Sequence, residues 1–505
     1  MTSPNKHPKG LAILFFTEMW ERFSFYGMKA LLVFYLIKYH FFSDDTAAEY
    51  VGNYAALVYA LPVLGGYLAD RFLGMRKAVF YGAVLLILGH LGMAFEGSQA
   101  FLDGENIVRD EKALSVFFLS LGLIIMGVGF LKPNISTMVG RLYPENDPRR
   151  DSGFTIFYMG INLGAFIATI ICPWLAEKYG WKYGFGAAGI GMVFGLITFH
   201  LGKGWLKGVG EPPSVERLKE KVFLGLNREV IIYILGILLV FVNWQLVRHH
   251  TVVGNLLMLT AGAFLVYIGW YMAKKANRAT KQQLVVLLVL FVSATVFFAF
   301  LEQQYISLNL FADRMVDRNI FGIDVKAGQF LSLNALFIIM FGPVVAALWI
   351  RLSRAKKEPN VPVKFGLGII FAAISFAFLI FGLKVAGVEG KVNATWLVLS
   401  YLFVTLGELA LSPVGLSSVT KLSPKEIVSF MMGGWFLASA ASEYLAAVFS
   451  KLASTETIGG EVVNKLELFN NFNHLFYVML YIGLGFGVVL LIFSPILKKW
   501  MHGIK

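Results

Sequence analysis

Fourteen long apolar segments constrain the fold of this 505-residue chain more than any other feature. Each is close to or longer than the ~20 residues that an α-helix needs to cross a bilayer. Because lipid offers no hydrogen-bond partners to an exposed backbone, such segments cross it as helices. We therefore expect an all-α membrane protein with fourteen spans. The segments lie at residues 10–39, 49–70, 75–97, 113–132, 154–178, 181–203, 228–247, 252–273, 283–312, 328–352, 363–385, 393–420, 427–453 and 469–497.

The charges fit this class and give an orientation. Only 15% of the residues are charged, against ~25% in soluble proteins. The net charge of +13 would otherwise suggest nucleic acid, but the basic residues are spread over short loops, so we expect no such partner. With the N-terminus inside, the inside loops hold about twice as many Lys and Arg as the outside loops, which predicts that both termini are cytoplasmic.

Two turn-rich, charged stretches divide the chain. Residues 208–228 follow six apolar segments, and residues 274–283 precede the last six. We expect an N-terminal six-helix bundle at 1–207, a cytoplasmic linker with an inserted helix pair at 208–281, and a C-terminal six-helix bundle at 282–505. Two six-span halves are typical of transporters built on repeats, which bind their substrate between the halves near the bilayer midplane.

The first apolar segment carries charge at bilayer depth. At ~100° per residue, Glu18, Glu21, Arg22 and Lys29 fall within an arc of about 100°, and Tyr26 borders it. A charge at the centre of a membrane helix costs about 2.5–3.5 kcal/mol on insertion scales. The charged face is therefore either a structural ion cluster that locks helices together or a binding and proton site that faces a polar cavity.

The loop after the second segment contains a recognisable signature. Gly66-x-x-x-Asp70-Arg71-x-x-Gly74-x-Arg76-Lys77 resembles the cytoplasmic loop signature of the major facilitator superfamily. The resemblance implies the fold of that superfamily, with two six-helix bundles and, here, two extra helices. It also implies a gating role for Asp70, Arg71 and Arg76, as a latch that opens when the two halves move.

The charged stretch of the first segment resembles a more specific motif. Glu18-x-x-Glu21-Arg22-Phe23 is similar to the first-helix motif of the proton-coupled oligopeptide transporter family. Two positions depart from the family pattern. Phe25-Tyr26 stands where Tyr-Tyr is usual, which removes one hydroxyl. Lys29 stands where Arg is common, and lysine is a point charge without the bidentate geometry of arginine.

Further matches follow the order of that family over nearly the whole chain, including the extra helix pair of its bacterial members. Phe298 stands where many members have Trp. The matching residues are Tyr59, Lys132 in Gly-Phe-Leu-Lys-Pro-Asn, Tyr158 and Asn162 in the fifth segment, Phe298 and Glu302 in Phe-Phe-Ala-Phe-Leu-Glu-Gln-Gln, Asn334, Glu408 and Ser412 in Gly-Glu-Leu-Ala-Leu-Ser-Pro, and Trp435.

The resemblance implies proton-driven uptake of di- and tripeptides by alternating access. A peptide of this kind is a zwitterion, so its ends need fixed opposite charges. The N-terminal half offers the cations Arg22, Lys29 and Lys132, which suit the carboxylate, and the C-terminal half offers Glu302 and Glu408, which suit the ammonium group.

Uncharged side chains complete the expected site. Aromatic walls accept varied apolar groups, and amides can bond the peptide backbone or its amino end. The expected substrate-binding residues of this kind are Tyr26, Tyr59, Tyr158, Phe298, Trp435, Asn162, Asn334 and Ser412.

Proton coupling has two candidate positions in the sequence. Glu302 stands in an apolar stretch without a neighbouring cation, so desolvation there would favour its protonated form. Glu18 and Glu21 compete for the role, but the adjacent Arg22 should keep at least one of them ionised.

Simpler structural roles stay open for several of these residues. Phe298 and Trp435 could be ordinary packing, and Tyr158 with Asn162 could form a helix–helix hydrogen bond. Such bonds in membranes average about 0.6 kcal/mol. Glu408 and Lys132 could be purely structural, although either is costly to bury unpaired.

Other classes of function find less support. The sequence shows no Gly-x-Ser-x-Gly elbow, phosphate-binding loop or metal-ligand spacing, so we expect no enzyme, no metal site and no cofactor beyond the proton gradient. Its one cysteine, Cys172, cannot build a disulfide framework within the chain. A related carrier of nitrate, an amino acid or a drug-like compound is the alternative. The expected partners are di- and tripeptides, peptide-like drugs, protons and the lipid of a bacterial inner membrane, and a monomer suffices.

Overall fold

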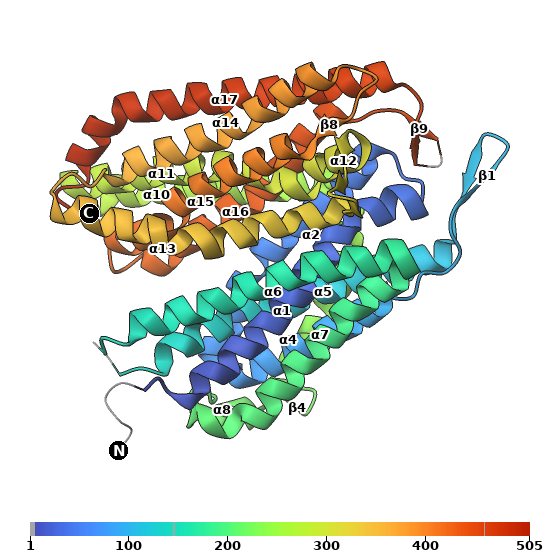
Figure 1. The fold of residues 1–505 in the computed structure, drawn as a ribbon. Helices are drawn as coiled ribbons and strands as arrows, with labels where there is room; N and C mark the ends of the chain where they lie inside the picture. The colour runs from blue at the N-terminus through green and yellow to red at the C-terminus, as the bar shows by residue number, and fades with distance from the viewer. Residues whose placement is uncertain (1–5, 145–146, 459, 505) are drawn as a thin grey trace. The chain divides into compact units, whose positions relative to one another are not determined.

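The computed structural model describes residues 6–144, 147–458 and 460–504, and helices make up most of them (Figure 1). Each of the expected apolar segments coincides with a helical segment, which confirms the all-α class. Twelve helical segments within the described residues are long and apolar enough to cross a membrane. The helices α1 (Lys9–Phe34) and α16 (Val428–Ser450) are not among the twelve. The count of fourteen spans and the cytoplasmic termini stay predictions.

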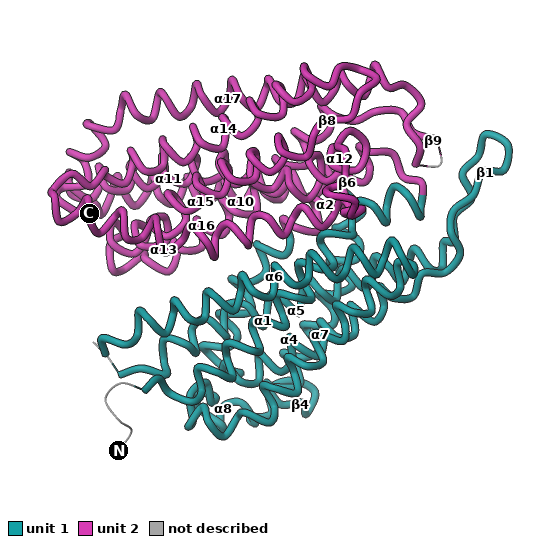
Figure 2. The backbone as a smooth tube through the Cα atoms, viewed as in Figure 1, with its two compact units in different colours: residues 1–40, 57–249 teal, residues 41–56, 250–505 magenta. Residues whose placement is uncertain are grey.

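The chain forms two compact units (Figure 2). Unit 1 contains residues 1–40 and 57–249, and unit 2 contains residues 41–56 and 250–505. The chain passes between the units at three places: after residue 40, inside α2 (Asp44–Ala60), and between the two helices of the inserted pair. The three-part division expected from the sequence stays a prediction. By contact, the first helix of the pair groups with unit 1 and the second with unit 2.

Unit 1 is an assembly of long helices with two small hairpins. Besides the C-terminal end of α2, its elements are α1 (Lys9–Phe34), η1 (Tyr35–Tyr39), α3 (Pro62–Leu68), η2 (Ala69–Leu73), α4 (Met75–Met93), β1 (Phe101–Asp103), β2 (Asn106–Val108), α5 (Glu111–Arg141), α6 (Arg150–Tyr179), α7 (Trp181–Gly202), η3 (Lys203–Leu206), α8 (Val215–Lys219), β3 (Lys221–Phe223), β4 (Leu226–Asn227) and α9 (Arg228–Leu246). The segments η1 and η2 are π-helical turns, which continue α1 and α3.

Unit 2 is likewise an assembly of long helices with short strand pairs. Its elements are α10 (His250–Lys274), α11 (Arg278–Leu301), η4 (Glu302–Tyr305), α12 (Ser307–Arg314), β5 (Val316–Asp317), β6 (Asn319–Ile320), β7 (Ile323–Asp324), η5 (Ala327–Leu331), α13 (Ser332–Arg354), α14 (Val361–Ala386), β8 (Val392–Asn393), α15 (Ala394–Leu422), α16 (Val428–Ser450), η6 (Lys451–Ala453), β9 (Thr457–Ile458), β10 (Glu461–Val462) and α17 (Lys465–Trp500). Strands β5 and β8 pair in parallel, and the other four pairs are antiparallel hairpins.

Glycine allows the helices of unit 1 to approach closely. A Cβ atom on Gly65 of α3 would overlap the carbonyl oxygen of Gly129 of α5. The chain breaks helical regularity between α2 and α3, where Pro62 stands at the first helical position and supplies no N–H. This close approach of α3 to α5 sets the spacing between the segments that carry Tyr59 and Lys132.

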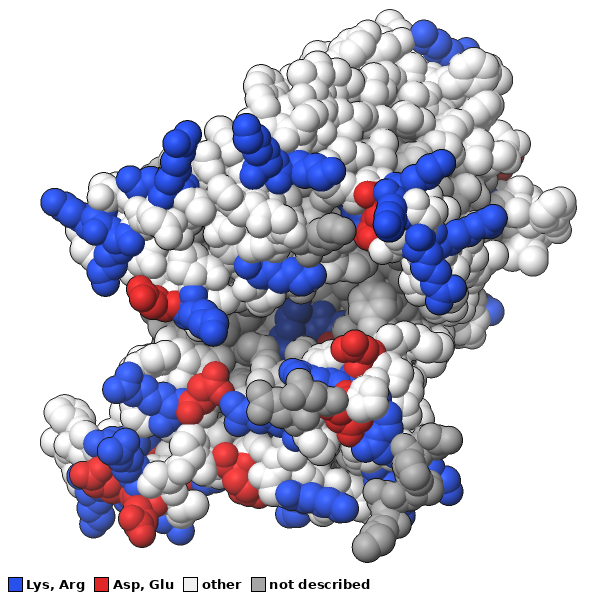
Figure 3. All heavy atoms as spheres, turned by 90° about the vertical axis from the view of Figure 1, so that its left-hand side faces the viewer, with Lys and Arg blue, Asp and Glu red and all other residues white. Residues whose placement is uncertain are grey.

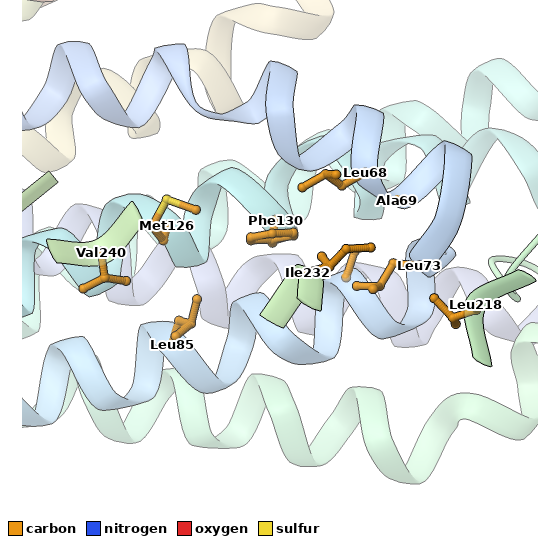
Figure 4. Packing of buried hydrophobic residues seen from close by; sticks show 10 residues of the cluster. Leu68, Ala69, Leu73, Leu85, Met126, Phe130, Leu218, Ile232 and Val240 are labelled. Atoms are coloured by element: carbon orange, nitrogen blue, oxygen red, sulfur yellow. The ribbon is translucent and has the colours of Figure 1, made fainter. Parts of the chain in front are cut away.

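A cluster of buried apolar side chains joins α3, η2, α4, α5, α8 and α9 (Figure 4). Lipid tails are as apolar as these side chains. At bilayer depth such a cluster therefore stabilises the fold by van der Waals packing between helices, not by removing apolar surface from water. Its buried members are Leu68, Ala69, Leu73, Ala78, Leu85, Met126, Phe130, Leu218, Ile232 and Val240. The cluster fixes the short helix α8 of the linker against the helices beside η2.

Polar contacts hold the N-terminal part of α2 in unit 2. The carboxylate of Asp44 accepts two hydrogen bonds from Arg314, at 2.6 and 2.7 Å, and both side chains are buried. One helical turn further, Glu49 pairs with Lys451. Asn53 lies 2.8 Å from Nδ1 of His250. These three contacts explain why residues 41–56 group with unit 2 although the rest of α2 does not.

Basic side chains project from many places on the face drawn in Figure 3, and acidic side chains are fewer there. This is the left-hand side of Figure 1, where α17 ends. The distribution agrees with the basic loops from which the orientation in the membrane is predicted.

We expect Gly65→Ala to lower the thermal unfolding temperature of the detergent-solubilised protein. The added methyl group would meet the Gly129 carbonyl, and overpacking of this kind costs about 1–3 kcal/mol. Gly66→Ala is the matched control, because its Cβ would meet Pro133 at an ordinary 3.5 Å. Equal unfolding temperatures for the two variants would contradict the close approach of α3 and α5.

Candidate functional site

The expected site residues fall into two clusters, one in each unit, and each is described here within its own unit. In unit 1 they stand on α1 (Glu18, Glu21, Arg22, Tyr26, Lys29), α2 (Tyr59), α5 (Lys132), α6 (Tyr158, Asn162), η2 (Asp70, Arg71) and α4 (Arg76). In unit 2 they stand on α11 (Phe298), η4 (Glu302), α13 (Asn334), α15 (Glu408, Ser412) and α16 (Trp435).

The centre of the first cluster is an ion network on α1. Nε of Arg22 lies 3.1 Å from Oε1 of Glu18, one turn before it, and Arg22 also pairs with Glu21. Glu18, Glu21 and Arg22 are 2%, 0% and 3% exposed. Such burial of three charges is possible because they neutralise one another in part.

Small residues let neighbouring helices cover this network. A Cβ on Gly164 of α6 would overlap the carbonyl oxygen of Met19, and a Cβ on Gly27 of α1 would meet Sγ of Cys172. The α6 backbone therefore packs directly on α1.

Two further cations belong to the same cluster. Nζ of Lys132 lies 4.2 Å from the ring centre of Tyr59, in a cation–π contact. Lys132 also interacts electrostatically with Arg22, Glu21, Glu18 and Lys29, and the last of these is 1% exposed. With every group ionised, three cations face two acids. Cations outnumber acids among these five groups, a composition that suits an added anion.

Some polar atoms of the network still have bonding capacity. Among the described residues, Oε2 of Glu18 and Nη2 of Arg22 are buried without a hydrogen-bond partner. Buried polar atoms are normally hydrogen-bonded, so these two mark a place for water or a ligand. Tyr26 borders them, with its ring centre 6.0 Å from the Arg22 guanidinium carbon.

The hydrogen bond between Tyr158 and Asn162 differs from the helix–helix bond that was one of their expected roles. Nδ2 of Asn162 donates to the backbone carbonyl of Tyr158 at 3.0 Å, so this hydrogen bond lies within α6 and not between helices. The phenol of Tyr158 is exposed. The bond orients the amide of Asn162 and leaves the Tyr158 ring projecting from the helix.

The second cluster is acidic and centres on Glu408. Nδ2 of Asn334 donates to Oε2 of Glu408 at 2.9 Å and to Oγ1 of Thr405 at 3.1 Å. Glu302 lies close enough to Glu408 for their charges to interact. Ser412, one turn beyond Glu408, has a buried Oγ without a hydrogen-bond partner among the described residues. The cluster can therefore bind a cation and accept a further hydrogen bond.

Aromatic rings stand beside this acidic cluster. Trp435 and Phe298 meet edge to face, with ring centres 6.3 Å apart. The indole of Trp435 also packs on Gly415 of α15, where a Cβ would overlap it. Trp435 is buried, while Phe298 is only partly buried.

The expected gating residues each have a partner in unit 1. Asp70 pairs with Arg141 at the end of α5, at 3.4 Å, and both side chains are more than half exposed. Nη1 of Arg71 donates to the Tyr67 hydroxyl at 3.0 Å. Arg76 binds the linker, because it pairs with Glu211 and its Nε donates to the Val209 carbonyl at 2.7 Å.

Sequence reasoning missed Thr405 and Arg141. Thr405 stands three residues before Glu408 on α15, so helical spacing could have indicated it as a neighbour of the acid. No local signal could have paired Arg141 with Asp70, since their contact depends on how η2 and α5 pack. Among the described residues, no group of three or more His, Cys, Asp or Glu side chains could hold a metal ion.

Comparison with known proteins places this architecture in a family. Residues 76–466 match the sequence model of the POT family. A peptide transporter, YePEPT, from Yersinia enterocolitica is 36% identical over 88% of this chain and 87% of its own length. The chain belongs to the POT family. The family resemblance read from the motifs is therefore confirmed.

Two further relatives extend the comparison over nearly the whole chain. Dipeptide and tripeptide permease A from Chromobacterium violaceum is 31% identical over 99% of this chain and 95% of its own length. A crystal structure of peptide transporter POT in complex with sulfate has a TM-score of 0.82 and 35% identity, over 98% of this chain and 96% of that one. The POT-family chain accordingly has the major facilitator fold. It is a multi-pass protein of a bacterial inner membrane, and its relatives are transporters, not enzymes.

We expect Asp70→Asn to slow transport while substrate affinity stays nearly unchanged. An exposed ion pair is worth ~0.2–1 kcal/mol, which corresponds to a rate change of up to about fivefold. Arg141→Gln should have the same effect, and the double variant should lose no more than either single variant. Uptake by proteoliposomes and substrate-dependent thermal stabilisation measure the two quantities. A fall in affinity as large as the fall in rate would contradict a purely conformational role.

Proposed function

We propose that this chain imports di- and tripeptides together with protons, by alternating access between two bundles. The observation that carries the proposal is the different charge of the two clusters: the cluster of unit 1 contains three cations and two acids, and the cluster of unit 2 contains the two acids Glu302 and Glu408. A short peptide is the metabolite class with one fixed charge of each sign and a variable middle. The names of the relatives, peptide transporter and dipeptide and tripeptide permease, support the same substrate class.

The peptide carboxylate would bind at the cluster of unit 1. Arg22, Lys29 and Lys132 supply the positive charge, and Nη2 of Arg22 has a donor to spare. Arg22 is already engaged by two glutamates, so Lys132 and Lys29 would add positive charge for the peptide carboxylate. Tyr26 and Tyr59 would contact the same end of the peptide through their rings and hydroxyls.

The peptide ammonium group would bind at the cluster of unit 2. Glu408 accepts one hydrogen bond from Asn334, which orients the carboxylate without neutralising it. An ammonium group would satisfy the remaining lone pairs of Glu408 and reduce its repulsion with Glu302. The Oγ of Ser412 stands one turn further along α15 for a second contact.

Aromatic and amide side chains would then bind the middle of the peptide. Tyr158, Phe298 and Trp435 offer ring faces and edges, which tolerate varied side chains because they impose few directional bonds. Asn162 would supply its carbonyl oxygen to the peptide, since its amide nitrogen already donates within α6. The same tolerance would admit peptide-like drugs.

Proton coupling is assigned first to Glu302. Glu18 and Glu21 each form an ion pair with Arg22, whereas Glu302 lies near a second acid, Glu408. Two acids at bilayer depth repel, so a proton on one relieves the other. Loading and release of this proton as the bundles alternate would link peptide movement to the gradient, with Asp70, Arg71 and Arg76 controlling the cytoplasmic opening.

We expect Glu408→Gln to weaken binding of free peptides far more than binding of N-acetylated peptides. Loss of a charge-assisted hydrogen bond is worth ~1.5–3 kcal/mol, or about 10–150-fold in affinity. Competition assays with the two peptide series measure the difference. Counterflow with nitrate, amino acids and drug-like compounds is the control for substrate class. An equal loss for both series would show that Glu408 does not bind the amino end.

We expect Glu302→Gln to abolish uptake driven by a pH gradient while peptide counterflow survives. Counterflow needs no net proton movement, so it tests binding and alternation without coupling. Glu389→Gln is the matched control, because this exposed acid in unit 2 pairs only with the exposed Lys465 among the described residues. Gradient-driven uptake at near the unmodified rate in Glu302→Gln would move the coupling role to Glu18 and Glu21.

A further inference from the structure

The hairpin of strands β3 and β4 carries an unusually apolar tip. Val222, Phe223, Leu224 and Leu226 are all exposed, and Leu224 is 84% exposed. The turn places Leu224 at φ +51° and Gly225 at φ +77°. A bulky residue is uncommon at positive φ, where Gly, Asn and Asp are preferred. The chain therefore presents a leucine to the outside at a position that disfavours leucine.

Unpaired basic side chains flank this tip. Residues 215–228 contain four basic and two acidic residues. One acid is neutralised, because Glu220 pairs with Arg228 at 2.8 Å. Lys219 and Lys221 are exposed and have no acidic partner within the described part of the chain. The exposed surface of the hairpin is thus apolar at its tip and positive at its base.

The hairpin is fixed at its base to the helices of unit 1. Leu218 of α8 is buried and lies near Leu73 in the apolar cluster (Figure 4). The Arg228 guanidinium also donates to the Arg217 carbonyl at 3.2 Å, which joins α8 to the start of α9. The tip is therefore held outward, while its base cannot swing freely.

The continuation of the hairpin into α9 places the tip near lipid. Helix α9 begins directly after β4 and is a candidate membrane span. At ~3.3 Å per residue, Leu224 lies within about 13 Å of the start of this helix. One side of α9 is exposed and apolar, with Ile234, Leu238 and Phe241 on it. A lipid-facing surface thus continues into the hairpin.

We propose that residues 215–228 form a docking element for the anionic phospholipid headgroups of the surrounding bilayer, with Phe223 and Leu224 inserted at the interface and Lys219 and Lys221 on the phosphates. Apolar groups beside basic ones are the chemistry that binds anionic membrane surfaces. Insertion removes the exposed apolar tip from water. This assignment does not depend on the substrate.

Hairpin β6–β7 of unit 2 provides a matched comparison. Its turn has the same form, with Phe321 at φ +51° and Gly322 at φ +82°, and Phe321 is 100% exposed. Its basic flanks are paired with acids: Lys326 with Asp324 at 2.6 Å and Arg318 with Asp313 at 3.7 Å. A hairpin with an exposed apolar residue at the same turn position but with paired basic flanks should lack the preference for anionic lipid.

The test uses the full-length protein with Leu224→Cys, labelled with bimane, in vesicles of phosphatidylcholine with or without phosphatidylglycerol. We expect quenching by brominated lipid to be at least about twofold stronger with phosphatidylglycerol, and the difference to vanish at high salt. Lys219→Gln with Lys221→Gln should remove the difference. Phe321→Cys, labelled in the same way, should show no difference in quenching between the two lipid compositions. Cys172 is buried, and labelling of the unmodified protein checks that it stays unlabelled.

Two results would overturn the proposal. One is equal quenching of the Leu224→Cys probe in both lipids, with equal access to iodide from water. The other is the same dependence on phosphatidylglycerol at Phe321→Cys, which would assign the effect to apolar character alone. The effect of salt is measured on the Leu224→Cys protein with both lysines present. The proposal therefore stays falsifiable if the double lysine variant fails to fold.

Discussion

The partial neutralisation of Arg22 by Glu18 and Glu21 is the interaction on which unit 1 depends. A single charge at the centre of a membrane helix costs about 2.5–3.5 kcal/mol, and α1 carries several. Ion pairing within the helix lowers that cost, provided that neighbouring helices separate the charges from lipid. The glycines that let α6 and α7 pack on α1, Gly164 against Met19 and Gly191 against Phe23, meet this need. The charged site and the close packing around it are therefore one feature.

In unit 2, neutral polar side chains stabilise the buried backbone at the end of α11. Helix α11 ends in the 3-10 turn η4, immediately where Glu302 stands, and buried backbone groups there need partners. Gln303 fills that need: its amide donates to the carbonyls of Ala299 and Ala446 and accepts from Ser307 and Ser450. A fully bonded amide locks η4 to α12 and α16. These hydrogen bonds fix the backbone beside Glu302.

The helices were predictable because span length and apolar character are local properties of the sequence. The charged face of α1 was predictable for the same reason, since residues three and four apart share a face of a helix. Contacts between distant segments were not. The Asp70–Arg141 pair and the bond of Asn334 to Thr405 depend on tertiary packing. The placement of α9 with unit 1 and α10 with unit 2 also follows from packing, because both helices look alike as apolar segments.

The charge pattern limits which substrates the proposed site can take. Nitrate would suit the cations of the unit 1 cluster, but as an anion it would not suit Glu408 and the nearby acid Glu302. A cationic drug would do the reverse. A free amino acid carries both charges, yet its two ends are separated by one carbon, whereas a dipeptide separates them by an additional residue. We therefore expect discrimination among these classes to depend less on the aromatic side chains than on whether a substrate carries both an anionic and a cationic end.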